Sequence, residues 1–182
     1  MKKIFRPSLM LALLAGTQLD ACAAERTWPI VETSTQAQCA WLARNATAHI
    51  FENEAQWQRI YPTGEPPTFA RTPDWERQVV LGLTLGARPS SGYVIELSGK
   101  QFELRGETLW LGFRERAPAP NEIREQVFTQ PCIFIVMRRG EWHSVILHNI
   151  DSGAEFKGEL NELIPASPGA ALIKAGYKAP AD

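Results

Sequence analysis

The segment from Val79 to Leu97 constrains the fold of this chain more than any other part of its 182 residues. It reads VVLGLTLGARPSSGYVIEL, in which two runs of apolar residues flank a Pro-Ser-Ser-Gly loop. Apolar residues that recur with a period of two lie on one face of a β-strand. The segment therefore predicts two strands, 79–85 and 93–97, joined by a loop.

The same alternation continues as far as residue 147. Residues 102–104 and 109–113 are typical of the two arms of a hairpin whose turn is 105–107. A further apolar run, 133–137, turns through charged residues into 142–147. The pattern predicts a mainly antiparallel sheet, arranged as a meander.

Two helices are expected before this sheet. The first is a short helix over Thr33–Arg44, and it is followed by a strand over 46–50. The second runs from Asn53 to Tyr61, because Asn53 is followed three residues later by Gln56, a pattern that favours a helix N-terminus. The predicted fold class is α+β, a mainly antiparallel β-sheet with one or two short N-terminal helices packed on it.

The first 24 residues are typical of a bacterial secretory signal. Basic residues precede an apolar run at 9–15, and small residues follow at 21–24. The run is far shorter than the roughly 18 to 20 residues that span a bilayer. We expect cleavage near Ala23 or Ala24 and a periplasmic protein. The alternative is a lipoprotein signal that leaves a lipidated Cys22 and an outer-membrane location.

Three parts of the chain follow from these patterns: a signal peptide (1–24), a single β-rich domain (25–150) and a C-terminal tail rich in Pro, Gly and Ala (151–182). The tail loses the apolar period, so we expect it to add little to the core.

Two cysteines remain after the signal segment, Cys39 and Cys132. In an oxidising compartment an even pair favours a disulfide, and its long loop would contribute on the order of 4 to 5 kcal/mol on the chain-entropy model. The alternative is two buried free thiols that pack as small apolar groups.

The composition argues against several kinds of partner and activity. The formal net charge of −1 provides no electrostatic reason to expect nucleic acid, and membrane contact is expected only if Cys22 is lipidated. Ser90 and Ser91 lie in a loop without a nucleophile elbow. His143 and His148 would lie on opposite faces of one strand, which separates them as metal ligands. We expect no enzyme activity, catalytic residue, metal or cofactor.

Recognition through loops is the remaining hypothesis. A proline-stiffened loop between two strands has a low ordering cost, and Arg and Tyr are common interface anchors. The candidate partner-binding residues are Arg88, Pro89, Ser90, Ser91, Gly92 and Tyr93, with Ala117–Gln126 as a second loop. Alternatively, Gly92 only supplies a permissive backbone angle and Tyr93 points into the core. On the binding hypothesis, replacing Arg88 and Ser91 with alanine weakens capture of a partner without lowering the melting temperature.

An ordered set of motifs runs through the middle of the chain. The set comprises the helical Glu54-Ala55-Gln56-Trp57, then Asp74-Trp75 before Val79-Val80, then Leu85-Gly86, Pro89, Ser91, Gly92, Tyr93 and Ile95, and finally Pro118, Pro120, Gln126, Thr129 and Pro131. On these residues, the chain from about 49 to 138 resembles the PrcB C-terminal domain family.

The family is named for an accessory subunit of a bacterial surface protease complex, and its members are mostly exported or lipid-anchored proteins without a known catalytic residue. The resemblance therefore implies a non-catalytic module that associates with another exported or envelope protein, for instance a protease. The alternative is a cysteine-protease inhibitor of the chagasin type, whose Pro-Thr-Thr-Gly-aromatic loop is similar to Pro89–Tyr93.

Overall fold

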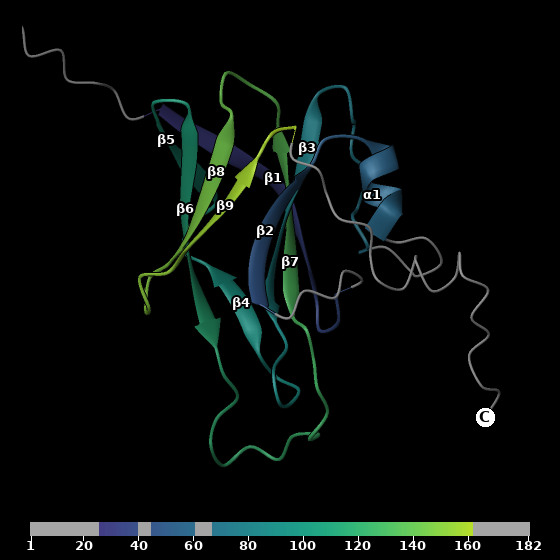
Figure 1. Ribbon diagram of the computed structural model, residues 1–182, viewed down its shortest axis with the longest axis vertical. Helices are drawn as coiled ribbons and strands as arrows, with labels where there is room; N and C mark the ends of the chain where they lie inside the picture. The colour runs from purple at the N-terminus through teal and green to yellow at the C-terminus, as the bar shows by residue number, and fades with distance from the viewer. Residues whose placement is uncertain (1–25, 40–44, 61–66, 162–182) are drawn as a thin grey trace, which may run out of the picture.

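A computed structural model describes residues 26–39, 45–60 and 67–161 (Figure 1). Within these ranges the chain is mostly β, with one short helix, close to the α+β class that the sequence predicts. The elements are β1 (Arg26–Gln36), β2 (Asn45–Phe51), α1 (Glu54–Ile60), β3 (Gln78–Gly86), β4 (Val94–Leu97), β5 (Gln101–Arg105), β6 (Thr108–Arg116), β7 (Cys132–Arg138), β8 (Ser144–Asn149) and β9 (Glu155–Glu159).

The strands form one sheet in the order β2-β3-β7-β1-β5-β6-β8-β9, with β4 paired to β6. Seven of the eight pairings are antiparallel, as expected, but β8 lies parallel to β6. The order differs from that of a simple meander because β8 does not pair with β7, the strand before it. Instead the chain crosses the molecule after β7 and places β8 beside β6.

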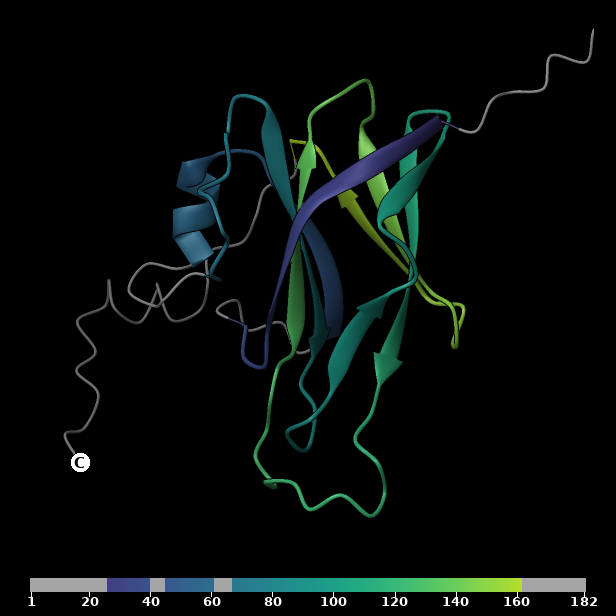
Figure 2. The same cartoon turned by 180° about the vertical axis from the view of Figure 1, so that it is seen from behind.

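This sheet curls into a nearly closed barrel (Figure 2). The two end strands approach each other closely at Gly158 of β9. A Cβ atom placed on Gly158 would lie 3.1 Å from Cγ1 of Ile50 and 3.6 Å from the backbone carbonyl carbon of His49, both in β2. Only glycine allows this approach without displacing a neighbour.

Buried apolar side chains fill the interior of the barrel. They come from β2 to β8 and from the segment that precedes β8, and the largest are Phe102, Phe113, Trp142, Ile50, Leu81, Leu83, Leu85, Leu109 and Ile135. The alternation predicted for residues 79–147 thus marks the inward face of each strand.

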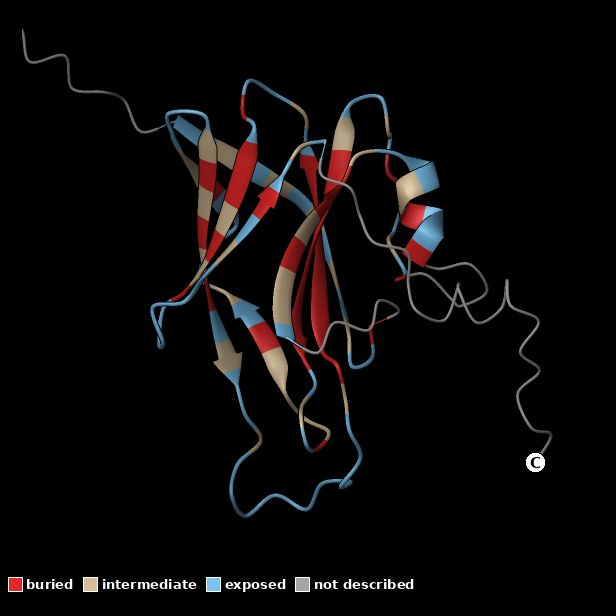
Figure 3. Cartoon of the chain, in the orientation of Figure 1, coloured by how far each residue is buried: buried red, intermediate tan, exposed pale blue. Residues whose placement is uncertain are grey.

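A second core lies outside the barrel, where α1 and residues 67–75 cover β2, β3 and β7. Trp57 of α1 packs edge-on against Phe51 and Phe134, with ring centroids 5.2 and 5.1 Å apart. Because β3 is covered on both faces, all of its residues from Val79 to Gly86 are buried rather than every second one (Figure 3).

The second predicted helix is confirmed as α1. The Asn53 side-chain oxygen accepts a hydrogen bond from the amide of Gln56 (2.9 Å), and the Gln56 side chain accepts one from the amide of Glu52 (2.6 Å). The first bond satisfies an amide that the first turn of a helix leaves free, and the second joins the residue before Asn53 to that turn.

The first predicted helix, over Thr33–Arg44, is wrong in the part that the structure describes. Residues up to Gln36 belong to β1, and 40–44 lie outside the described ranges. The Thr-Ser-Thr run carries β-branched residues that suit a strand, and the open edge of β7 pairs with all of 32–36. Tertiary pairing here overrides a weak helical pattern.

The sheet also continues beyond the domain boundary expected at residue 150. Residues Glu155–Glu159 form β9, which pairs antiparallel with β8, in a region where the sequence predicts a tail. The expected signal segment with Cys22, and residues 162–182 of the expected tail, lie outside the described residues. Among those described, no helix has the length and apolar character needed to span a membrane.

The expected disulfide joins Cys39, just after β1, to Cys132, the first residue of β7. The two Cα atoms are 5.8 Å apart and 93 residues separate the cysteines along the chain. Both are buried in the outer core, so the bond ties the end of β1 to the strand beside it.

Candidate functional site

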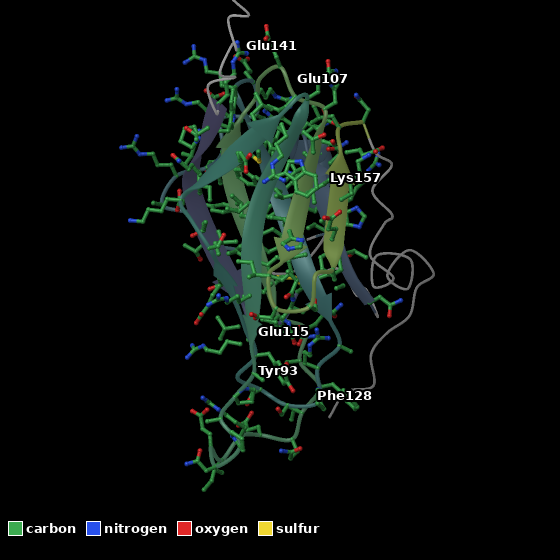
Figure 4. The ribbon with its side chains drawn as sticks, turned by 90° about the vertical axis from the view of Figure 1, so that its left-hand side faces the viewer. Tyr93, Glu107, Glu115, Phe128, Glu141 and Lys157 are labelled. Carbon is green, nitrogen blue, oxygen red and sulfur yellow. A yellow bond between two sulfur atoms is a disulfide. The ribbon has the colours of Figure 1, made fainter. Side chains whose placement is uncertain are left out.

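Two loops gather at one end of the barrel (Figure 1). The first, residues 87–93, joins β3 to β4, and the second, residues 117–131, joins β6 to β7. We call these two loops together the tip. Figure 4 shows Tyr93, Glu115 and Phe128 at this end, far from Glu107 and Glu141 at the other.

Arg88 binds within the tip rather than projecting from it. Its Nε donates a hydrogen bond to Oε1 of Glu115 (2.5 Å) and its Nη2 donates one to Oε2 (2.7 Å). Each of the two side chains is only 24% exposed. The guanidinium carbon also lies 5.9 Å from the centre of the Tyr93 ring. The hydrogen bond to Glu115 is the main reason why the pKa of Arg88 is raised above its usual value.

The backbones of the two loops are joined as well. Arg88 and Thr129 exchange two backbone hydrogen bonds, of 2.8 and 3.0 Å. The Thr129 hydroxyl donates to the carbonyl of Ser90 (2.8 Å), and the amide of Ser91 donates to the carbonyl of Glu125 (3.2 Å). The long loop is therefore held to the short one at Glu125 and at Thr129.

Gly92 lies where the long loop crosses the short one. Its φ of +93° belongs to the region that favours glycine. A Cβ atom there would lie 2.9 Å from Nε of Arg124 and 3.2 Å from Cβ of Pro118. Gly92 therefore supplies a permissive backbone angle, as one alternative expected. The absence of a side chain at Gly92 also lets the long loop pass close to it.

The side chains that the tip presents to solvent are different ones. Ile123 is 99% exposed, Phe128 is 82% exposed, and Val127 is about half exposed. All three lie in the loop 117–131, and Figure 3 shows that this loop is almost wholly exposed. We call them the apolar tip residues. Sequence reasoning missed Val127 and Phe128, because it bounded the second loop at Gln126.

A charged pair lies among the apolar tip residues. Arg124 binds Glu122 within the same loop, and this hydrogen bond is the main reason why the pKa of Glu122 is lowered. Since these two charges offset each other, a partner would meet exposed apolar side chains with little local net charge.

The residue types that could support catalysis are dispersed. Nδ1 of His143 lies 3.3 Å from a carboxylate oxygen of Glu107, and Nδ1 of His148 lies 3.7 Å from one of Glu155 in β9. A shallow hollow of about 310 Å³ lies beside His148, but its Arg105 is bound to Glu103 and lies over the Trp110 ring. Among the residues that the structure describes, no three His, Cys, Asp or Glu side chains are grouped so that they could bind a metal ion.

A comparison with protein families bears on this end of the molecule. The matched segment begins at Val79 in β3 and ends at Arg138 in β7. Residues 79–138 match the PrcB C-terminal family. The matched segment contains both tip loops and the strands from which they extend. The resemblance expected for 49–78, which includes α1, lies outside the match. Neither the curated proteins nor the solved structures include a match to the chain.

The geometry of the short loop also bears on the inhibitor alternative. A loop that inhibits an enzyme by entering its concave active site has to project freely. Here Ser90 is buried, and the amide of Ser91 is bonded to the long loop. Pro89–Tyr93 is thus packed against its neighbour, which disfavours its use as a free inhibitory loop.

Proposed function

We propose that this chain is a non-catalytic, exported binding module that associates with another protein of the bacterial envelope through the tip. The observation that carries the proposal is the exposure of Ile123 and Phe128 on a loop that is fixed at its base. Bulky apolar side chains exposed in this way are typical of interaction sites.

The energetics favour a small, preorganised contact. Full burial of a Phe or Ile side chain contributes about 1.5 to 3 kcal/mol. The hydrogen bonds of Arg88 and Thr129 hold the base of the loop in the free protein, so that less conformational entropy is lost on binding. On this proposal Arg88, Ser90, Ser91 and Gly92 position the loop, while Ile123 and Phe128 contact the partner.

The family match supports a partner from a protease complex. The family is named for an accessory subunit of a protease complex, and the match includes both tip loops. A secreted or surface protease, or a protein that assembles with one, is therefore the partner class that we propose.

The test is capture of proteins from the envelope extract of the producing cells with the tagged full-length chain. The variant Ile123→Ser with Phe128→Ser should lower recovery of the captured protein at least about tenfold. Truncation of even one anchor side chain weakens the free energy of binding by more than about 1 kcal/mol. The matched control is Ile150→Ser, another exposed isoleucine, outside the tip. Equal loss in both variants, or in neither, contradicts the proposal.

Mass spectrometry of the mature chain tests the proposed export in the same preparation. A chain that begins just after Ala23 or Ala24 supports simple cleavage, and a diacylated Cys22 supports the lipoprotein form. A chain that retains residues 1–24 contradicts export. Inhibition of a papain-like protease in a parallel assay, abolished by substitutions in Pro89–Tyr93, would favour the inhibitor function instead.

A further inference from the structure

The barrel has an open side, where β1 and the β4–β5 segment separate. Residues 26–29 of β1 pair with β5, and the amide of Ile30 donates to the carbonyl of Lys100 (3.1 Å). Beyond this point β1 pairs with β7 only, and β4 pairs with β6 only, among the strands that the structure describes. Each strand therefore has an unpaired edge along this side, which Figure 2 shows between β1 and β4.

A bulge in β1 turns its inward face toward this opening. The register moves from Ile30 opposite Met137 to Glu32 opposite Val136, so that one residue of β1 has no partner in β7. After the bulge, Thr33 lies opposite Ile135 and Thr35 opposite Ile133.

Residues opposite each other in an antiparallel pair lie on the same face of the sheet. Because Ile133 and Ile135 are buried in the barrel interior, Thr33 and Thr35 lie on the interior face too. Both threonines are nevertheless exposed. Solvent thus reaches the inner face of the barrel between β1 and β4.

The opening is a groove of about 450 Å³. Its apolar lining comes from both separated strands and from β7, and it consists of Ile30, Val31, Ile95, Leu97 and Ile133. Val31 is about half exposed although it is a β-branched apolar residue within a strand. Lys100 is also part of the lining, as is Glu32, whose carboxylate accepts a hydrogen bond from the amide of Ala70.

We propose that this groove binds an extended segment of the protein that docks on the tip, which adds a strand between β1 and β4. The inference rests on the proposed function. Two unpaired strand edges require backbone donors and acceptors, which an extended peptide supplies. The apolar lining selects a segment with an apolar side chain at every second position and without strong charge.

The groove begins close to the short loop of the tip along the chain, because its lining includes Ile95, two residues after Tyr93. Tyr93 ends the short loop and Val94 begins β4, so a partner bound at the tip can extend a segment along β4. β4 has four residues. At about 3.3 Å per residue, a segment of about five residues spans this edge.

The probe is a blocked peptide of alternating threonine and valine, about five residues long, enough to span β4. Amide hydrogen exchange of the full-length chain is followed by NMR. At a peptide concentration about ten times its Kd, amides in β4 and in residues 31–35 should exchange about tenfold more slowly. The same peptide with N-methylated backbone nitrogens should not protect them, because it cannot donate to a strand edge.

Thr33→Lys with Thr35→Lys should abolish the protection by the peptide, since both side chains line the open face. Thr27→Lys, at an exposed position of β1 that pairs with β5, is the matched control and should leave the protection unchanged. Equal protection in both variants overturns the proposal.

Three other results also overturn it. The first is protection of these amides in the absence of peptide, which would mean that the chain's own residues outside the described ranges occupy the groove. Protection that rises with protein concentration would indicate a second copy of the chain. Absence of protection at any peptide concentration excludes strand addition. If the groove variants still capture the envelope partner while the tip variants do not, the proposed function stands and only the strand addition fails.

Discussion

Arg88 is predicted to stabilise the tip from within, and a double-mutant cycle with Glu115 measures this directly. The substitutions are Arg88→Met and Glu115→Gln, singly and together. Two opposite charges about 4 Å apart attract each other by about 4 kcal/mol at an effective dielectric constant of about 20. Desolvation and loss of side-chain freedom offset much of this attraction. Because the pair is bidentate and each side chain is 24% exposed, we expect a coupling free energy of about 1 to 3 kcal/mol.

A second ion pair, between β6 and β4, serves as the control. Arg116 and Glu96 lie 2.8 Å apart, with side chains 66% and 50% exposed, so solvent screens their attraction. Their coupling should be about 0.5 kcal/mol or less. Urea denaturation at neutral pH, followed by tryptophan fluorescence and circular dichroism, measures both cycles.

The single variant Arg88→Met should also lower the melting temperature by several degrees. This differs from the expectation based on sequence alone, in which Arg88 contacts a partner and its loss leaves the melting temperature unchanged. Equal coupling in the two cycles would refute the claim that burial and bidentate geometry make Arg88 a structural residue. An unchanged melting temperature with lost partner capture would restore Arg88 to the binding surface.

Three further outcomes follow from the geometry. Gly158→Ala should lower the free energy of unfolding by about 1 kcal/mol, because the new Cβ crowds β2 at the closure of the barrel. Reduction of the bond between Cys39 and Cys132 should lower it by at most about 4 to 5 kcal/mol, which urea denaturation with and without reductant will show. The pKa of Glu122 is lowered, so its stabilising effect is complete above the ordinary glutamate pKa and is lost as pH falls through the lowered value. An NMR titration should place the Glu122 midpoint below 4.5, and Arg124→Gln should raise it; an identical midpoint in both proteins excludes this pair as the cause.

Patterns of neighbouring residues in the sequence were enough to predict most of the strands, the start of the helix and the disulfide. The period of two in 79–147 predicts β3 to β8, since an amphipathic strand has to repeat at that spacing. Asn53 and Gln56 predict the start of α1, because their side chains bond to nearby amides in any context. The pair of cysteines, together with the expectation of export, predicts the disulfide.

Other elements depended on partners far away in the chain. β1 forms because β7, nearly a hundred residues later, presents an open edge to residues 32–36. β9 forms because β8 does the same for Glu155–Glu159. A short polar segment carries too little periodicity to show this, and β-propensity depends strongly on the neighbouring strand.

The sequence by itself determined that this chain builds a β scaffold with proline- and glycine-containing loops, and that it resembles PrcB C-terminal proteins. Only the tertiary structure decided which loop residues face outward. Arg88 turns inward because the strand register brings Glu115 beside it, 27 residues later, and Phe128 is left exposed because Thr129 beside it is bonded to the short loop. Register is a property of paired strands, so no local pattern in a single strand contains it.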